Sequence, residues 1–208
     1  MTGAIEDDSR HAGIFWLFKS TERDAPSYAS ALPFAPGLPV TFRRVGLETI
    51  HALAQAMDTT DQTQIARRFE RGKHCYVGLL AGEIVTYGWV TFDEEHIGEL
   101  GLTIRLRAGE AYIWDCATLP AYRGQRLYPA LLAYMLRSLA AAGLRSIWLG
   151  TDMDNIPSQK GVALIGFQPI VDAGLVGTSQ GGGLWIRQRP DVSDQDAIDA
   201  HRVLLGRL

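Results

Sequence analysis

The segment from Ala111 to Ala142 constrains this 208-residue chain more than any other. Strand-forming residues at 112–118 lead into a short polar turn, and an apolar helix at 127–142 follows directly. The backbone N–H groups in the first turn of such a helix have no partners within it, and the helix dipole favours negative charge there. Arg123 and Arg126 add positive charge at the same place. The segment is therefore expected to bind a phosphorylated ligand.

Composition is that of an ordinary globular protein, with 47% hydrophobic and 21% charged residues. A formal charge of -3 and a pI of about 5.9 argue against general nucleic-acid binding. The longest apolar run, 127–144, contains Arg137 and Ser138 and so predicts a buried helix rather than a membrane span. Two cysteines, Cys75 and Cys116, do not make a disulfide framework, which favours a reducing cytoplasm.

Short strands and helices alternate through most of the chain. Strands are expected at 40–45, 75–80, 84–92, 112–118, 146–150, 167–171 and 184–189. Helices are expected at 47–57, 61–71, 127–142, 157–165 and from Ser193 onward. Residues 93–106 are ambiguous, because strand-forming side chains there are interrupted by glycines and charges. The order βααβββαβαββα predicts an α/β fold with a mixed sheet.

The length suits one domain with an extension. Residues 1–39 are predicted to be that extension, with one apolar strand at 14–18 and an irregular connection after it. The alternatives for this extension are packing on the sheet edge and a homodimer contact. Residues 40–190 are predicted to form the main domain, and 191–208 a terminal helix packed on it.

Two motifs, in this element order, resemble those of a known family. The first is the turn Arg123-Gly124-Gln125-Arg126-Leu127-Tyr128, which follows a strand ending in Thr118-Leu119-Pro120. The second is Asn155-Ile156-Pro157-Ser158, which opens a helix that ends in Ile165-Gly166-Phe167. With a strand between them, the two motifs resemble the GNAT superfamily of acyl-CoA-dependent acetyltransferases, over about residues 40–189.

The resemblance implies a splayed mixed sheet flanked by helices, with acetyl-CoA as the acyl donor and no metal. It also implies direct transfer of the acetyl group to a primary amine of a small molecule or peptide, without nucleic-acid or membrane partners. The pantetheine arm is expected along the strand backbone and the pyrophosphate at the turn. The cofactor-binding candidates that the resemblance implies are Cys116, Thr118, Arg123, Gly124, Gln125, Arg126, Leu127, Tyr128, Asn155 and Ser158.

The chain departs from the family pattern at three positions. Arg126 and Tyr128 stand where the family has small residues, so these side chains must point away from the phosphates unless Arg126 itself contacts one. Many members carry a tyrosine that reprotonates the leaving thiolate, and that position is Val162 here. The candidates for this acid are therefore Tyr128, Ser158 and water.

The base that takes the amine proton is expected among the nearby acids Asp115, Glu99 and Asp152. Asp115 is the first choice because it lies in the cofactor strand, where a carboxylate is costly unless it is hydrogen-bonded or hydrated. Alternation along the strand predicts that Asp115 faces opposite to Trp114 and Cys116.

Simpler interpretations remain beside these. Cys116 is more typical of a small buried side chain than of a nucleophile. Trp114 and Trp148 are expected in the core. The alternative function is a catalytically silent acyl-CoA sensor or interaction module of the same fold, and a third is transfer of a longer acyl or aminoacyl group.

Overall fold

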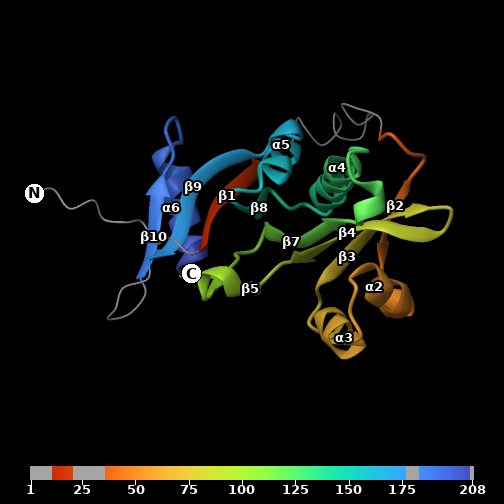
Figure 1. Cartoon of the computed structure of the whole chain (residues 1–208). Coiled ribbons are helices and arrows are strands. Elements are labelled where there is room, and N and C mark those ends of the chain that lie inside the picture. The colour runs from red at the N-terminus through yellow and green to blue at the C-terminus, as the bar shows by residue number, and fades with distance from the viewer. Residues whose placement is uncertain (1–10, 21–35, 177–182, 207–208) are drawn as a thin grey trace, which may run out of the picture.

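The computed structural model describes residues 11–20, 36–176 and 183–206, and its central feature is an eight-stranded sheet with helices on both faces (Figure 1). The strands are β1 (His11–Lys19), β2 (Thr41–Val45), β3 (His74–Leu80), β4 (Glu83–Thr91), β5 (Glu94–Ile97), β6 (Leu102–Arg105), β7 (Glu110–Thr118), β8 (Ser146–Asp152), β9 (Gln168–Val176) and β10 (Gly183–Gln188). The helices are α2 (Ile50–Ala56), α3 (Gln62–Glu70), α4 (Leu127–Ala141), α5 (Ile156–Leu164) and α6 (Asp194–Leu204), and the short 3-10 turns are η1 (Leu47–Thr49), η2 (Gly98–Leu100) and η3 (Pro120–Tyr122). The mixed α/β fold expected from the sequence is confirmed.

Local signals in the sequence set the element boundaries. The Asp61 side chain accepts a hydrogen bond from the Gln64 backbone N–H (3.1 Å) and so caps α3. The Asn155 side chain caps α5 in the same way. Gly143 adopts a left-handed φ of 85° directly after α4, which ends that helix. Capping residues therefore begin α3 and α5, and a terminal glycine ends α4, where the sequence predicts.

The strand from the N-terminal extension lies inside the sheet, not at its edge. The strand order is β10-β9-β1-β8-β7-β4-β3-β2, and β1 pairs antiparallel with both β8 and β9. The expectation that the extension packs on the sheet edge is therefore wrong for β1. The physical reason lies in its five consecutive apolar residues, Ile14 to Phe18, all of which are buried. A continuous apolar run of this kind suits a strand that is covered on both faces.

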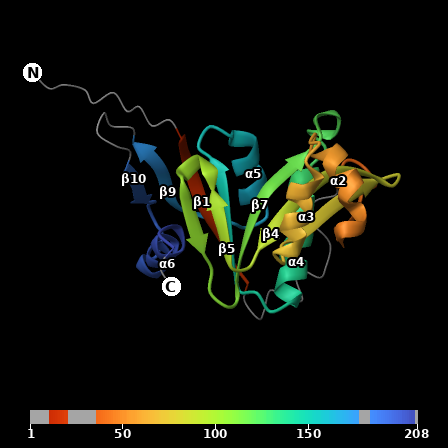
Figure 2. The same ribbon diagram turned by 90° about the horizontal axis from the view of Figure 1, so that it is seen from below.

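The ambiguous segment 93–106 forms a small hairpin of its own. Strands β5 and β6 pair antiparallel in a separate two-stranded sheet, with η2 between them. Figure 2 shows this hairpin in front of the main sheet, on the same face as α3 and α6. Ile104 of β6 is fully buried in the core between the hairpin, α6 and the main sheet.

Helices α4 and α5 cover one face of the sheet, and α2, α3 and α6 cover the other (Figures 1 and 2). The neighbours β7 and β8 are parallel and paired only from Glu110–Ser146 to Ile113–Leu149. Beyond Ile113, β7 continues to Thr118 without pairing to β8. The sheet therefore opens between these two strands, and this opening positions the site described next. No helix in the described part of the chain is long and apolar enough to cross a membrane.

Candidate functional site

The opening between β7 and β8 is bordered by backbone from both strands. On the β8 side it is bordered by Gly150, where an added Cβ would come 3.1 Å from the Tyr112 hydroxyl oxygen. On the β7 side the ladder to β4 is irregular, with pairing at Trp89–Trp114 and again at Tyr87–Ala117. The skipped residues on β7 form a bulge, which interrupts backbone pairing and redirects side chains.

Asp115 lies in this bulge with a left-handed φ of 43°. Its carboxylate meets Arg68 of α3, so it shares a face with Trp114, whose ring Arg68 also contacts. Cys116 instead packs toward α4, because an added Cβ at Gly88 would lie close to both the Cys116 sulfur and Met135. The expectation that Asp115 faces opposite to Trp114 is therefore wrong. The left-handed residue breaks the two-residue alternation on which that expectation depended.

The turn before α4 presents backbone groups to solvent. Gly124 and Arg126 both have positive φ, 77° and 56°. Arg126 occupies the N-cap position, and no side chain caps the helix there. Within the described residues, the first N–H groups of this 15-residue helix therefore receive no capping bond from the side chain at the N-cap. Arg126 itself is exposed, so its side chain points away from the core.

The other turn residues have distinct surroundings. The Arg123 Nε donates to the carbonyl of Thr118 (3.2 Å), which folds this side chain back onto the end of β7. The Thr118 hydroxyl donates to the Thr86 hydroxyl (3.1 Å). The carbonyl of Gln125 accepts from the Gly37 N–H (2.9 Å), and Leu127 is buried. Arg123, Gln125 and Arg126 are the exposed side chains of this turn.

Tyr128 and Ser158, both predicted site residues, meet across the two helices on the same face. The Ser158 hydroxyl donates to the Tyr128 hydroxyl oxygen at 3.1 Å. Close packing makes this contact possible, because the Tyr128 ring lies 3.0 Å from where a Cβ at Gly161 would be. Burial raises the pKa of Tyr128 above its usual range. Asn155 accepts from the Ser158 N–H (3.1 Å), which fixes the first turn of α5.

The surroundings of Cys116 do not favour a role as a nucleophile. Burial is the first cause of a raised pKa for its thiol, and the Asp115 charge adds to it. A thiol held in its neutral form is a weak nucleophile. The interpretation of Cys116 as a packed side chain is thus favoured.

A cleft of about 1260 Å³ lies on the opposite face of the sheet from α4 and α5. It is bounded by α3, by the β5–η2 segment and by the ends of β7 and β8. All three predicted base candidates line it: Asp115, Glu99 and Asp152. The cleft therefore meets the opening between β7 and β8 from the side opposite the α4 turn.

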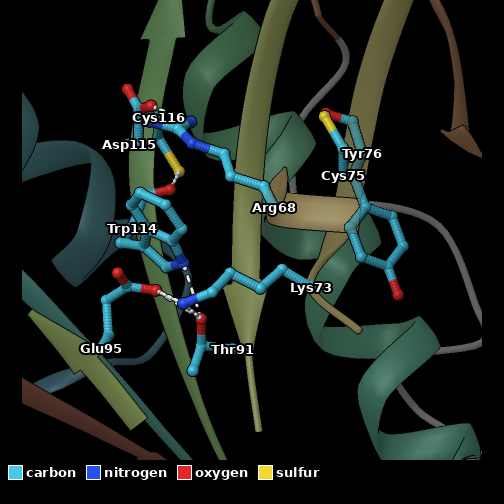
Figure 3. Close-up of polar contacts among 9 residues, drawn as sticks. All are labelled: Arg68, Lys73, Cys75, Tyr76, Thr91, Glu95, Trp114, Asp115 and Cys116. Atoms are coloured by element: carbon cyan, nitrogen blue, oxygen red, sulfur yellow. Dashed lines mark hydrogen bonds and ion pairs between the residues drawn. The ribbon is translucent and has the colours of Figure 1, made fainter. Parts of the chain in front are cut away.

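Figure 3 shows the floor of this cleft, where the Trp114 indole lies between two cations. The Arg68 guanidinium is 4.5 Å from its ring centroid and the Lys73 ammonium 5.2 Å. Arg68 also pairs with Asp115 at 2.5 Å, and Lys73 pairs with Glu95. Both cations are largely buried and both are neutralised, as buried charges must be.

One hydroxyl joins the hairpin to the sheet at this floor. The Thr91 hydroxyl accepts from the Trp114 Nε1 (3.0 Å) and from Lys73 (3.2 Å), and donates to Glu95 (2.7 Å). Lys73 also donates to the carbonyl of Glu94 (3.3 Å). The indole therefore has a fixed orientation, with its polar edge turned into the network.

Sequence reasoning missed the basic side chains of this cleft and treated Trp114 as core. The lining residues from α3 and its C-cap are Gln64, Arg67, Arg68 and Arg71. Their spacing, three, four and seven residues from the first, places them on one face of a helix. A polar stripe of this kind is usually solvated, and only the packing of α3 over the splayed strands shows that it lines a cleft.

The sequence profile described as the Acetyltransferase (GNAT) family matches residues 46–167, which is more than half of the chain. The chain belongs to this family. The match spans both motifs, the bulged strand and the helix that carries the basic stripe. No curated protein sequence matches the chain.

Solved structures of the same fold include a tandem GNAT protein from the clavulanic acid biosynthesis pathway, with a TM-score of 0.54, 18% identity, and coverage of 86% of this chain and 53% of that one. A Drosophila protein matches with a TM-score of 0.54, 15% identity, and coverage of 87% and 52%. A GNAT-family acetyltransferase from Colwellia psychrerythraea matches with a TM-score of 0.52, 14% identity, and coverage of 76% and 53%. This chain spans about half the length of each of these structures. At such identities the likeness concerns the fold alone.

Proposed function

We propose that this GNAT-family protein transfers the acetyl group of acetyl-CoA to a primary amine in a ternary complex. The observation that carries the proposal is the opening between β7 and β8. An uncapped helix N-terminus lies on one side of it, and a charged cleft of about 1260 Å³ lies on the other. Cofactor and acceptor can then meet at one point from opposite faces of the sheet, which is the arrangement that direct transfer requires.

The cofactor end of the proposal follows the α4 turn. The pyrophosphate accepts hydrogen bonds from the free amides after Arg126, with the Arg126 side chain adding charge. The pantetheine arm lies along the edge of β7 that does not pair with β8, from Cys116 to Thr118, as an added strand. The thioester then reaches the bulge, where an interrupted ladder offers backbone N–H to a developing oxyanion.

We assign the general acid to Tyr128 and a positioning role to Ser158. The Ser158 hydroxyl donates to the Tyr128 oxygen, which leaves the phenolic proton of Tyr128 free for the thiolate of CoA. Because burial raises the pKa of Tyr128, the phenol keeps this proton at neutral pH. A tyrosine on α4 would thus serve where the family pattern on α5 has Val162.

We assign the general base to Asp115, which lines the cleft beside the bulge and is oriented by Arg68. In the reaction, the ammonium gives one proton to the base, and the amine nitrogen forms a bond to the acetyl carbon. As the tetrahedral intermediate collapses, the second amine proton passes to water, the C–S bond breaks, and the thiolate takes the phenolic proton of Tyr128, which is then replaced from water. Asp152, exposed at the end of β8, is the alternative base.

Calorimetry with acetyl-CoA and CoA, followed by a thiol-release assay over a panel of primary amines, tests the function. We expect micromolar binding of the cofactor and amine-dependent release of free CoA. Absence of cofactor binding to the folded protein would overturn the proposal. Cofactor binding without release for any amine would overturn transfer and favour the silent acyl-CoA sensor instead.

A further inference from the structure

The cleft on the acceptor face has two walls of opposite charge. The α3 wall carries the cations Arg67, Arg68 and Arg71, with Lys73 just beyond the helix. The opposite wall carries Glu99 from η2 with Asp152 and Asp154 at the end of β8. Charge is therefore separated across the cleft rather than mixed, which gives a bound molecule a preferred direction.

Internal pairing removes only part of this charge. Arg68 is held by Asp115, and Lys73 by Glu95. Arg67 and Arg71 are exposed, and within the described part of the chain their side chains have no hydrogen-bond or ion-pair partner. Two guanidinium groups, one helical turn apart, thus face the cleft with their donors unused.

The acidic wall lies beside the opening between β7 and β8. Tyr112 lines the cleft next to Gly150 together with Glu99 and Asp152. Burial raises the pKa of its phenol, and the charges of Glu99, Glu95 and Asp152 add to the effect. An ammonium group is attracted to this end of the cleft, where the acetyl group arrives under the proposed function.

A second cation at the far end of the same molecule would face Arg67 and Arg71, and like charges repel. A neutral far end would leave both guanidinium groups without a partner. An anionic far end accepts hydrogen bonds from them, and charge-assisted bonds of this kind are stronger than neutral ones. The division of charge therefore selects among amines by the group that they carry at the other end.

We propose that the acceptor is a primary amine that also bears an anionic group, a carboxylate or a phosphate, and that Arg67 and Arg71 bind this group. The inference rests on the proposed function and names the substrate class of the same site. It predicts discrimination against polycationic amines and against simple alkylamines.

Matched pairs of acceptors test the inference. The pairs are β-alanine with β-alaninamide, 4-aminobutyrate with butylamine, and O-phosphoethanolamine with ethanolamine, each assayed by CoA release at saturating acetyl-CoA. We expect the anionic member of at least one pair to have a kcat/KM roughly 10- to 100-fold higher, the range that one or two hydrogen bonds to charged groups give. The carboxylate pairs and the phosphate pair separate the two sources of anionic charge.

In the double variant Arg67→Ala/Arg71→Ala, the ratio of kcat/KM for the anionic acceptor to that for its matched partner should fall close to one. The main cause should be a higher KM for the anionic acceptor. The control is Arg43→Ala/Arg44→Ala on β2, which removes the same charge outside the cleft and should keep the preference. Turnover with no preference for the anionic member, or a preference that survives in the cleft variant, overturns the inference and leaves the proposed function standing. Absence of turnover with every amine overturns the proposed function itself.

Discussion

At the residue scale, two backbone positions with positive φ shape the site, and neither is glycine. Asp115 turns one carboxylate toward the cleft, and Arg126 opens the N-terminus of α4. Left-handed backbone costs a residue with a Cβ about 1 kcal/mol relative to glycine. Such cost at positions beside a proposed ligand is consistent with a functional role.

Replacement of Arg126 by glycine separates its two roles. The Arg126→Gly variant should gain roughly 0.5–1 kcal/mol in free energy of unfolding, because glycine adopts a φ of 56° without strain. It should also bind CoA several-fold more weakly, because one phosphate contact is lost. Urea denaturation and calorimetry measure the two effects, with Arg123→Gly as the matched variant. A variant that is less stable, or that binds CoA as tightly as the wild type, contradicts this account.

Removal of one hydroxyl tests the acid. The Tyr128→Phe variant should lower kcat by about 10²-fold, the scale of one general acid, with little change in the KM for acetyl-CoA. Wild-type kcat should hold up to pH 10 and above, because burial raises the pKa of Tyr128 and keeps the phenol protonated. Tyr134→Phe on the same helix is the control. A Phe variant with wild-type kcat assigns the proton to water instead.

Cys75 predicts a loss of stability at alkaline pH. It is fully buried, and desolvation raises the pKa of its thiol in the folded state. The stabilisation from holding the thiol neutral is complete below the unfolded pKa of about 8.5, and is lost as pH rises from there toward the folded value. Cys75 alone should lower the free energy of unfolding by about 1.4 kcal/mol per pH unit above pH 8.5, and the buried thiol of Cys116 adds a contribution of the same sign. Urea titrations between pH 7 and 10 measure the slope, which should become less steep by the Cys75 share in the Cys75→Ala variant.

At the scale of elements, Arg68 adds a polar link between α3 and the sheet to the apolar packing of Ile65 and Phe69. Arg68 stacks on both Trp89 (5.0 Å) and Trp114 (4.5 Å) and pairs with Asp115. A single planar cation thus links a helix to two strands and a bulge. Arginine suits this position because its guanidinium combines stacking with directed hydrogen bonds.

The Arg68→Lys variant should therefore remain impaired although it keeps the charge. We expect a loss of about 1–3 kcal/mol in free energy of unfolding, because Asp115 loses a directed partner and two rings lose a stacked plane. The acceptor KM should rise while cofactor affinity stays within about twofold. Arg71→Lys, on the same helix but unstacked, is the matched control for denaturation. Wild-type stability in Arg68→Lys would show that a positive charge is sufficient at this position, without stacking on the two rings.

At the scale of the whole molecule, the fold depends on a strand distant from the rest in sequence. Strands β8 and β9 do not pair with each other, because β1 lies between them and forms hydrogen bonds with both. Its Trp16 Nε1 also donates to the Thr151 hydroxyl (2.9 Å), close to the opening beside β7. The N-terminal strand thus supports the β8 side of the site.

A fragment of residues 40–208 should accordingly fail to fold cooperatively, because two sheet ladders and five buried apolar side chains are lost. The milder Phe15→Ala variant should lose about 3–5 kcal/mol in free energy of unfolding. Leu47→Ala, at a side chain that is 50% exposed, serves as control with little loss. Circular dichroism melts measure both. A sharp thermal transition in the fragment, with acetyl-CoA binding retained, would show that β1 is dispensable.

Local signals in the sequence predicted most elements correctly. Hydrophobic periodicity placed α4, capping side chains placed the start of α3 and α5, and glycines marked the ends of α4 and α5. The two motifs also predicted that Tyr128 and Ser158 belong to one site. The hydrogen bond between their hydroxyls is consistent with that prediction. These features depend on residues close together in the chain, so pattern alone is informative about them.

Three features came only from the tertiary structure: the place of β1 inside the sheet, the face on which Asp115 lies, and the basic wall of the cleft. Each depends on contacts between distant segments or on one backbone angle that breaks strand periodicity. The sequence of the strand–turn–helix at 111–142 by itself predicts an anion-binding segment, because the amides in question are local to it. What lies opposite it, and therefore which acceptor we propose, is decided by how α3 and the end of β8 pack around the opening.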